Sequence, residues 1–600
     1  DTITEKDGEN YSNTQNPQIH ATDVNPFTIT VKLNGKTVRE DKAVLNDQGI
    51  YSSWFGIEYL SDGKYEVIAT DESENTKTIN FTLDREAPEL VVDTITEKDG
   101  ENYSNTQNPQ IHATDVNPFT ITVKLNGKTV REDKAVLNDQ GIYSSWFGIE
   151  YLSDGKYEVI ATDAAGNTKI INFTLDREAP RKTSLRMTGG RYIKDEAGKT
   201  IWYATTADKI VVYVAFDEEL EVLPKLKING TVEKELSIRA TNGEYYAIYT
   251  VNDNELKEGP ISIEISGYAD KAGNVGNTLT NKDITLASQG EIIIDRIAPA
   301  LVVDTITEKD GENYSNTQNP QIHATDVNPF TITVKLNGKT VREDKAVLND
   351  QGIYSSWFGI EYLSDGKYEV IATDAAGNTK IINFTLDREA PRKTSLRMTG
   401  GTYAKNEEKG KVVYYAKDGD TITVYAKFNE DLGTLPKLNI NGNVVDFTGR
   451  YDNGEYYVKY TVDSKLAEGA ITIEISGYAD KAGNVGNILY NTDITVAGQS
   501  EVIIDREAPA LVVDTITEKD GENYSNTQDP QVHATDVNPF TITVKLNGKV
   551  VREDKAKLNS NGIYSSWCGI GYLADDEYEV IATDVAGNTK TINFILDRTM

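Results

Sequence analysis

Five-residue loops with an aspartate at one end and an asparagine at the other recur along this sequence and offer oxygen ligands for a metal ion. One such loop reads Asp163-Ala164-Ala165-Gly166-Asn167. Calcium takes six to eight oxygen ligands, which carboxylate and amide side chains supply. The candidate calcium ligands are Asp163, Asn167, Asp374, Asn378, Asp270 and Asn274. The alternative is a simple turn, in which Asp163 bonds the backbone and Gly166 adopts a left-handed conformation.

The first copy of this loop has a different composition. It reads Asp71-Glu72-Ser73-Glu74-Asn75, so Glu74 stands where the other copies have glycine. A residue with a Cβ atom is strained in the left-handed region. We therefore expect this loop to change its shape.

Side chains that could catalyse a reaction are few. The histidines are His20, His112, His323 and His533, one position in four copies of a segment. No serine, cysteine or carboxylate pair is placed around them by the sequence. Cys568 stands where related segments have phenylalanine, so we expect a small hydrophobic residue rather than a nucleophile. With no phosphate-binding loop and no zinc-ligand spacing either, we expect no enzyme activity.

Tryptophans at matching positions are candidates for a ligand-binding surface. They are Trp54, Trp146, Trp357 and Trp567. Trp146 shares a strand-like segment with Tyr143 and Phe147, and alternation along a strand sends these aromatic side chains to opposite faces. Trp146 is therefore either a core residue, as is usual in β-sandwiches, or part of an exposed patch for a sugar or a protein.

The elements that must position these residues are β-strands. Phe119, Ile121, Val123 and Leu125 alternate with polar residues, which is the period of a half-buried strand. Asn126-Gly127 follows as a hairpin turn. Short strands with a turn every 8–12 residues or so, in units of roughly 90–120 residues, predict β-sandwiches.

Internal repeats give the domain organisation. A segment that begins Asp-Thr-Ile-Thr-Glu-Lys-Asp-Gly starts at Asp1, Asp93, Asp304 and Asp514, and a longer unit opens at Arg181 and again at Arg392. With the short unit called A and the long unit called B, the order is A-A-B-A-B-A. The predicted domains are 1–86 (A, without its first strand), 87–178 (A), 179–297 (B), 298–389 (A), 390–507 (B) and 508–600 (A). The missing strand and the abrupt end suggest a fragment of a longer protein.

The repeats resemble a known family of domains. Leu152-Ser153-Asp154-Gly155-Lys156-Tyr157-Glu158-Val159 is similar to strand F of immunoglobulin-like domains, with Tyr157 as the tyrosine corner. The run from Tyr157 to Asn167 resembles the bacterial immunoglobulin-like (Big-type) repeats of large Gram-positive surface proteins and adhesins. Unit B is similar to another such repeat, through Asp208 to Glu218 and Ala269 to Asn274. The resemblance implies extracellular domains on the bacterial cell surface or cell wall, and calcium at the domain ends of some relatives.

Each junction carries a proline-bearing signature. Asp84-Arg85-Glu86-Ala87-Pro88 contains no glycine, and proline restricts both itself and the residue before it. We expect neighbouring domains to stack into an elongated rod. Beside Asp176, Arg177 is expected to pair with a carboxylate across the junction, which argues against a cation at that point.

Charge narrows the choice of partner. With 61 basic and 94 acidic residues the formal net charge is −33, which disfavours nucleic acid and anionic membranes. The leading hypothesis is an all-β stalk of six immunoglobulin-like sandwiches that projects a functional head, with the neighbouring domains as its partners. The alternatives are a multivalent array that binds a host or cell-surface glycan or protein, and accessory modules of a secreted polysaccharide-active enzyme.

Overall fold

The chain is almost entirely β-structure. The computed structural model describes residues 2–195, 198–238, 242–406 and 411–599. Within these residues there are β-strands and 3-10 helices but no α-helix, which confirms the predicted all-β class. The short 3-10 helices are η1 (Asn281–Asp283), η2 (Ala287–Gln289) and η3 (Asn491–Asp493). None of the described helices has the length and apolar character that crossing a membrane requires.

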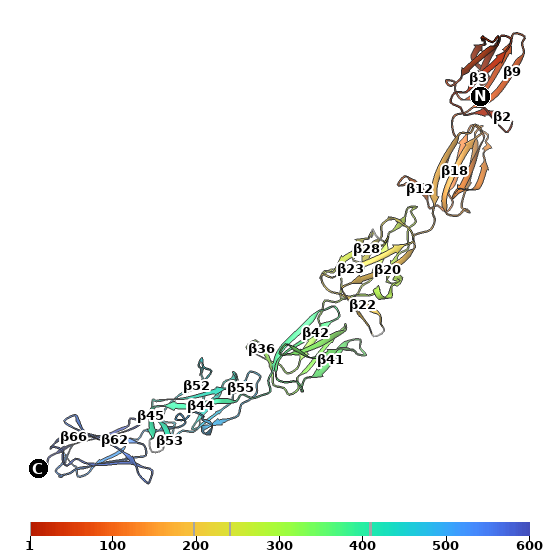
Figure 1. Ribbon diagram of the computed structural model, residues 1–600. Helices are drawn as coiled ribbons and strands as arrows, with labels where there is room; N and C mark the ends of the chain where they lie inside the picture. The colour runs from red at the N-terminus through yellow and green to blue at the C-terminus, as the bar shows by residue number, and fades with distance from the viewer. Residues whose placement is uncertain (1, 196–197, 239–241, 407–410, 600) are drawn as a thin grey trace. The chain divides into compact units, whose positions relative to one another are not determined.

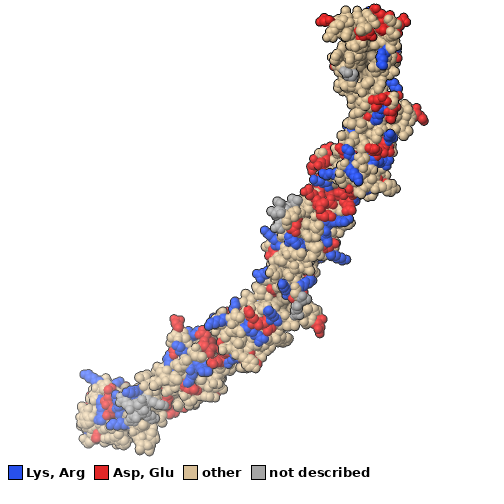
Figure 2. Space-filling model, turned by 45° about the vertical axis from the view of Figure 1, so that its right-hand side comes forward, with Lys and Arg blue, Asp and Glu red and all other residues tan. Residues whose placement is uncertain are grey.

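Two compact units make up the chain. One comprises Asp1–Ile297 and Ala375–Gly377, and the other comprises Ala298–Asp374 and Asn378–Met600. The strands of each unit gather into separate sandwiches (Figure 1), each with a hydrophobic core of its own. On the face drawn in Figure 2, acidic and basic side chains are mixed along the surface.

The second A sandwich shows the architecture of the A units. Its four-stranded sheet has the order β10 (Glu89–Val92), β13 (Gln110–Asp115), β17 (Tyr143–Gly148), β16 (Val136–Leu137). Its six-stranded sheet has the order β11 (Thr96–Lys98), β12 (Glu101–Ser104), β19 (Thr168–Leu175), β18 (Gly155–Asp163), β14 (Phe119–Leu125), β15 (Lys128–Lys134). β12 runs parallel to β19, and the other pairings are antiparallel. Two sheets with this strand order form an immunoglobulin-like sandwich.

The B sandwich uses more and shorter strands. One sheet has the order β20 (Lys182–Gly189), β23 (Lys209–Phe216), β28 (Tyr245–Thr250), β27 (Ser237–Ile238), and the opposite sheet has β26 (Val232–Glu235), β25 (Lys225–Ile228), β30 (Ile263–Ser266), β32 (Leu279–Thr280). A third four-stranded sheet has the order β21 (Arg191–Lys194), β22 (Thr200–Ala204), β33 (Ile292–Ile294), β29 (Gly259–Pro260). A two-stranded sheet pairs β24 (Leu220–Val222) with β31 (Ala269–Asp270). β20, β23 and β28 lie side by side in Figure 1.

Alternation along the strands explains the A core. Phe119, Ile121 and Val123 on β14 are buried, and the threonines between them are half-buried. Tyr157 is 2% exposed, and its hydroxyl donates to the carbonyl of Ser153 at 2.6 Å, which confirms the tyrosine corner. This bond ties the start of β18 to the loop before it, so β18 ends at a defined position, at Asp163.

The first A sandwich has one strand fewer. Its smaller sheet is β3 (Gln18–Asp23), β7 (Tyr51–Gly56), β6 (Val44–Leu45), without a counterpart of β10. Its larger sheet has the order β1 (Thr4–Lys6), β2 (Glu9–Ser12), β9 (Thr76–Leu83), β8 (Gly63–Asp71), β4 (Phe27–Leu33), β5 (Lys36–Lys42). Ile19 and Ala21 on β3 are consequently half-buried, and they line an open groove of about 330 Å³.

Candidate metal centres at the sandwich junctions

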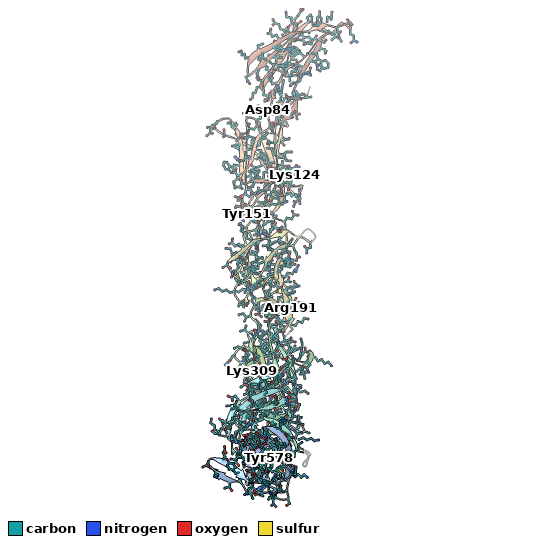
Figure 3. The ribbon with its side chains drawn as sticks, turned by 90° about the vertical axis from the view of Figure 1, so that its left-hand side faces the viewer. Asp84, Lys124, Tyr151, Arg191, Lys309 and Tyr578 are labelled. Atoms are coloured by element: carbon teal, nitrogen blue, oxygen red, sulfur yellow. The ribbon has the colours of Figure 1, made fainter. Side chains whose placement is uncertain are left out.

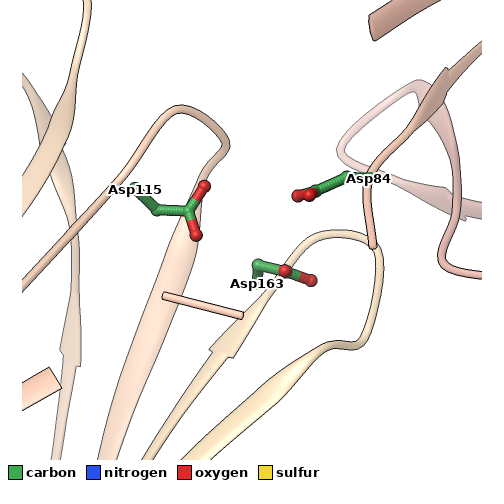
Figure 4. A group of neighbouring side chains, drawn as sticks. All are labelled: Asp84, Asp115 and Asp163. Carbon is green, nitrogen blue, oxygen red and sulfur yellow. The ribbon is translucent and has the colours of Figure 1, made fainter. Parts of the chain in front are cut away.

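Three carboxylates converge where the first sandwich passes into the second. Asp84 lies on the linker between the two (Figure 3), Asp115 ends β13, and Asp163 ends β18. Figure 4 shows the three carboxylates turned toward one another, and one ligand oxygen from each lies within 4.8 Å of the others. Asp84 and Asp163 are 3% and 1% exposed. The linker and two strand ends together thus build a buried acidic cluster.

Backbone and amide hydrogen bonds hold the cluster in place. The Asp84 amide donates to the carbonyl of Ser12 at 2.9 Å, which fixes the linker to its own sandwich. The Asn117 side chain donates to Oδ2 of Asp84 at 2.5 Å. Nδ2 of Asn167 donates both to Oδ2 of Asp163 at 2.8 Å and to the carbonyl of Asp84 at 2.9 Å. Asn167 therefore joins the loop of the second sandwich directly to the linker.

The electrostatics of this cluster disfavour three unneutralised charges. Burial, and after it the negative charges of Asp84 and Asp163, raises the pKa of Asp115 to about 6. Burial also raises the pKa of Asp84. Arg85, the next residue in sequence, turns away and pairs with Asp62 at 3.0 Å. The arrangement suits a bound cation, because a divalent ion would neutralise charges that no adjacent arginine reaches.

The same construction recurs where an A sandwich passes into a B sandwich. Asp176, Glu218 and Asp270 form one cluster, and Asp387, Glu430 and Asp480 form another. Burial, followed by neighbouring carboxylates, raises the pKa of both Glu218 and Glu430 to about 7.

The linker contact is repeated as well. Nδ2 of Asn274 donates to the carbonyl of Asp176 at 2.9 Å, and Nδ2 of Asn484 donates to that of Asp387 at 2.7 Å. An aspartate-asparagine turn that holds the preceding linker is therefore common to A and B units.

The junction between the fifth and sixth sandwiches supplies a further observation. Asp505 is 2% exposed, and its Oδ2 atom has no hydrogen-bond partner among the described residues. Burial, followed by Asp584 and Asp536, raises its pKa to about 7. An unpartnered carboxylate oxygen in such a position is costly unless something neutralises it.

The loops predicted to bind calcium are indeed turns, and some of their aspartates also belong to the clusters. Oδ1 of Asp163 accepts the amides of Gly166 and Asn167 at 2.7 and 2.9 Å, and Gly166 has a φ of +96°. Asp270 with Asn274 repeats the turn. Asp374 and Asn378 repeat it too, because the backbone and side-chain amides of Asn378 both donate to the Asp374 carboxylate at 2.9 Å. The side-chain amide nitrogens of Asn167, Asn274 and Asn378 donate to carboxylates, and those of Asn167 and Asn274 also donate to linker carbonyls. Calcium coordination by the asparagines stays a prediction.

Two expectations about this region are wrong. Glu74 does adopt the left-handed conformation, with φ of 65°, because Asp71 still accepts the amides of Ser73 and Asn75 at 2.8 and 2.9 Å. Arg177 does not pair across the junction. Its guanidinium contacts Asp154 of its own sandwich at 2.6 Å and the carbonyl of Leu152 at 2.6 Å. The positive charge of Arg177 is therefore directed away from Asp176.

Sequence reasoning missed Asp84 and Asp387 on the linkers and the acidic residues Asp115, Glu218 and Glu430, and it argued against a cation at Asp176. Asp84, Asp115 and Asp163 are far apart in sequence, so only the fold brings them together. A signal was present, because every junction signature begins with an aspartate.

The tryptophans are exposed, so the core interpretation is wrong. Trp54, Trp146, Trp357 and Trp567 are 69%, 68%, 69% and 66% exposed. Each side chain lies on the outer face of the smaller sheet, while Phe147, one residue later, fills the core. Cys568 is 3% exposed, and burial raises the pKa of its thiol to about 11, in line with a passive core residue.

Proteins of known structure show only a distant similarity to this chain. No protein-family model matches the chain, and no curated protein matches it. A three-domain immunoglobulin fragment of titin shares 12% identity with a TM-score of 0.26, over 50% of this chain and 98% of that chain. A tetra-tandem repeat from the extending region of a large adhesion protein shares 22% identity with a TM-score of 0.22, over 67% and 97%. The eight N-terminal domains of Down syndrome cell adhesion molecule share 12%, with a TM-score of 0.19, over 98% and 71%. The strand orders described above carry the assignment to tandem immunoglobulin-like sandwiches.

Proposed function

We propose that this chain is a structural stalk of an extracellular bacterial surface protein or adhesin, stiffened by calcium at its sandwich junctions. The support is physical. Sandwiches in tandem supply length, and short linkers with proline restrict bending. A spacer needs junctions that resist rotation, and the repeated bond from the loop asparagine to the linker carbonyl acts in that way.

The observation that carries the calcium part is the convergence of carboxylates from linker, strand end and loop. Calcium binds six to eight oxygens, and three carboxylates supply up to six. Asp84 comes from the linker and Asp115 and Asp163 from the next sandwich, so a shared ion would join the linker to that sandwich. The orphaned oxygen of Asp505 is a second, independent reason to place a cation at these junctions.

The experiment is a thermal melt of the full chain after chelation, with and without millimolar calcium. At a calcium concentration 100 times Kd each site adds about 2.7 kcal/mol, which raises the midpoint of a domain of this size by roughly 10 °C or more. Magnesium serves as the ionic control, because it prefers a smaller octahedral site and keeps its waters. An unchanged midpoint in calcium would remove the calcium part of the proposal.

A matched pair of variants localises the effect. Asp84→Asn with Asp115→Asn removes two charges from the first junction, and Asp47→Asn with Asp139→Asn removes two from exposed loops. Hydrogen exchange in the peptide 76–90, whose sequence occurs once in the chain, reports on that junction. We expect calcium to slow exchange there in the wild type and in the loop variant, but not in the junction variant.

One observation favours a second function. Exposed tryptophans are what a ligand-binding array would present, so multivalent binding of a glycan or protein stands beside the stalk. Nothing in the described residues favours accessory modules of a polysaccharide-active enzyme over either of these.

A further inference from the structure

A row of three side chains crosses the outer face of the smaller sheet in the A sandwiches that have a strand like β10. Val91 on β10 pairs with His112 on β13, and His112 pairs with Trp146 on β17. The ring centroids of His112 and Trp146 are 4.9 Å apart. The same histidine and tryptophan pair at 5.3, 4.9 and 4.6 Å in the other copies. Every A unit thus has an indole ring packed against a histidine ring at the same position on the outer face of the smaller sheet.

Polar contacts hold the indole ring in one orientation. Nε1 of Trp146 donates to Oε1 of Gln110 at 3.0 Å, and Gln110 donates in turn to the carbonyl of Asn108 at 3.2 Å. In the third A unit, His323 contacts Asp304 at 3.2 Å, so the ring beneath the tryptophan is also fixed. Because the indole N–H is already bonded within the sandwich, what remains for a partner is the apolar ring face. A preoriented ring loses little conformational freedom on binding.

The fold does not require this exposure. In the first B sandwich the corresponding sheet carries Tyr213, but the guanidinium of Arg186 covers that ring at 3.7 Å and pairs with Glu244 at 3.0 Å. The second B sandwich repeats the cover, with Arg397 over Tyr425 at 3.5 Å. The A units leave a larger and more apolar ring uncovered, at 66–69% exposure. A ring that is exposed at the same position in all four A units is a repeated surface feature that is available to a partner.

The neighbours of the ring indicate the chemistry of that partner. Thr114 and Ser144 form the next cross-strand pair on this face, so hydroxyls lie beside the His–Trp pair. The nearest charged partner of the row is a carboxylate, Asp93, and not a lysine or arginine. One isolated ring bordered by hydroxyls is a small apolar area for a protein interface, which buries about 800 Å² on each partner. It matches one face of a pyranose, whose C–H groups stack on an indole while its hydroxyls bond at the rim.

We propose that Trp54, Trp146, Trp357 and Trp567 are platforms for the pyranose rings of an uncharged polysaccharide. Each platform is weak by itself, and four copies on one chain bind a repeating polymer through avidity, which raises apparent affinity by about 10²–10⁴-fold. Anionic polysaccharides are disfavoured, because the row carries a carboxylate and the chain a net charge of −33. This inference rests on the multivalent binding proposed above and names its ligand, and it is independent of the stalk and of calcium.

The test is affinity electrophoresis of the full chain in gels that contain a soluble β-glucan, a galactomannan or a dextran, with alginate as the anionic probe. We expect at least one neutral polymer to retard the wild type and alginate not to do so. Replacing all four tryptophans by alanine should abolish the retardation. Replacing only three should weaken binding by about 10²-fold through loss of avidity.

A matched control removes four other exposed rings. Tyr59, Tyr151, Tyr362 and Tyr572 are 92%, 93%, 93% and 72% exposed on a loop of the same A units, and Figure 3 labels Tyr151. Their replacement by alanine should leave retardation intact. Folding of both variants is checked by thermal midpoint, which exposed substitutions change little. No retardation by any neutral polymer, equal retardation of the four-tryptophan variant, or cosedimentation with phosphatidylcholine vesicles instead would overturn the proposal.

Discussion

The first and second A sandwiches have nearly the same sequence but place the same aspartate in different surroundings. Asp71 is partly exposed and bonds within its own turn, to Ser73 and Asn75. Asp163 makes the same turn, is 1% exposed, and lies beside Asp84 and Asp115. The turn is therefore a property of the sequence, whereas the acidic cluster is a property of the junction. A single sandwich cannot form it.

A second difference concerns the core. β10 covers one edge of the second sandwich with Leu90 at 5% and Val92 at 4% exposure, and beneath it Ile111 is fully buried. In the first sandwich the equivalent Ile19 is half-buried, and Ile79 is 45% exposed. The comparison indicates that the strand after each proline completes the core of the sandwich that follows it.

The largest expected effect comes from removing that strand's apolar contacts. Leu90→Ala should destabilise the second sandwich by about 2–5 kcal/mol, because it leaves a cavity against Ile111. Val91→Ala on the outer face of the same strand is the control and should cost about 0.5 kcal/mol or less. Hydrogen exchange in urea, read on a peptide that contains Glu89, distinguishes this strand from its copies. Equal effects of the two substitutions would contradict the role of β10.

The converse experiment extends the first sandwich. Adding the sequence of residues 87–92 in front of Asp1 should close the groove of about 330 Å³ and slow exchange in β3. If exchange in β3 stays unchanged, the groove does not accept a strand in the position that β10 has in the second sandwich.

The pH dependence should have opposite signs at the two aspartate sites. The pKa of Asp115 is raised to about 6 in the folded chain. Without calcium, protonation of Asp115 therefore stabilises the junction. This contribution is complete below a pH of about 4 and is lost as the pH rises through 6. The loss is about 1–2 kcal/mol once solvent screening is allowed for. The Asn75 side chain lowers the pKa of Asp71, so that turn is stable above its ordinary pKa and weakens only in stronger acid.

Calcium should reverse the trend at the junction, because the ion binds deprotonated carboxylates. Melting curves from pH 4 to 8, in chelator and in calcium, measure both signs. A melting midpoint that rises with pH in chelator would contradict repulsion among the carboxylates at the junctions.

Much of the fold follows from the sequence, while the site does not. Alternation in Phe119–Leu125 predicts a strand, and the tyrosine corner fixes Tyr157, because both depend on neighbours a few residues away. The orientation of Trp146 could not be decided from the sequence, since β17 carries aromatic residues on both of its faces. Asp84 was missed because its partners lie on the next sandwich. The sequence also does not reveal that the neighbouring Arg85 pairs with Asp62 instead of with Asp84.

A smaller effect separates the two turns. Asn167→Ala removes the side-chain bond within the turn and also the bond to the carbonyl of Asp84, whereas Asn75→Ala removes the side-chain bond within the turn alone. We expect about 1–2 kcal/mol for Asn167 and about 1 kcal/mol for Asn75. The peptide 76–90 should exchange faster only in the Asn167 variant. Faster exchange of that peptide to the same extent in both would show that the linker bond contributes nothing.

The smallest effect concerns the left-handed residue of the first turn. Glu74→Gly should stabilise the first sandwich by about 0.5–1 kcal/mol, since glycine adopts a φ of 65° without strain. Gly166→Glu in the second sandwich should cost a similar amount. Urea midpoints of the two sandwiches measure both, and a destabilised Glu74→Gly variant would contradict strain at this position.

The most direct test of the calcium-held junction is calorimetric titration of calcium into the chelated full chain and into the variant with Asp84→Asn and Asp115→Asn. We expect saturable binding whose stoichiometry falls by one ion in the variant and stays unchanged in the Asp47→Asn, Asp139→Asn control. No saturable heat, or the same stoichiometry in all three proteins, would contradict it.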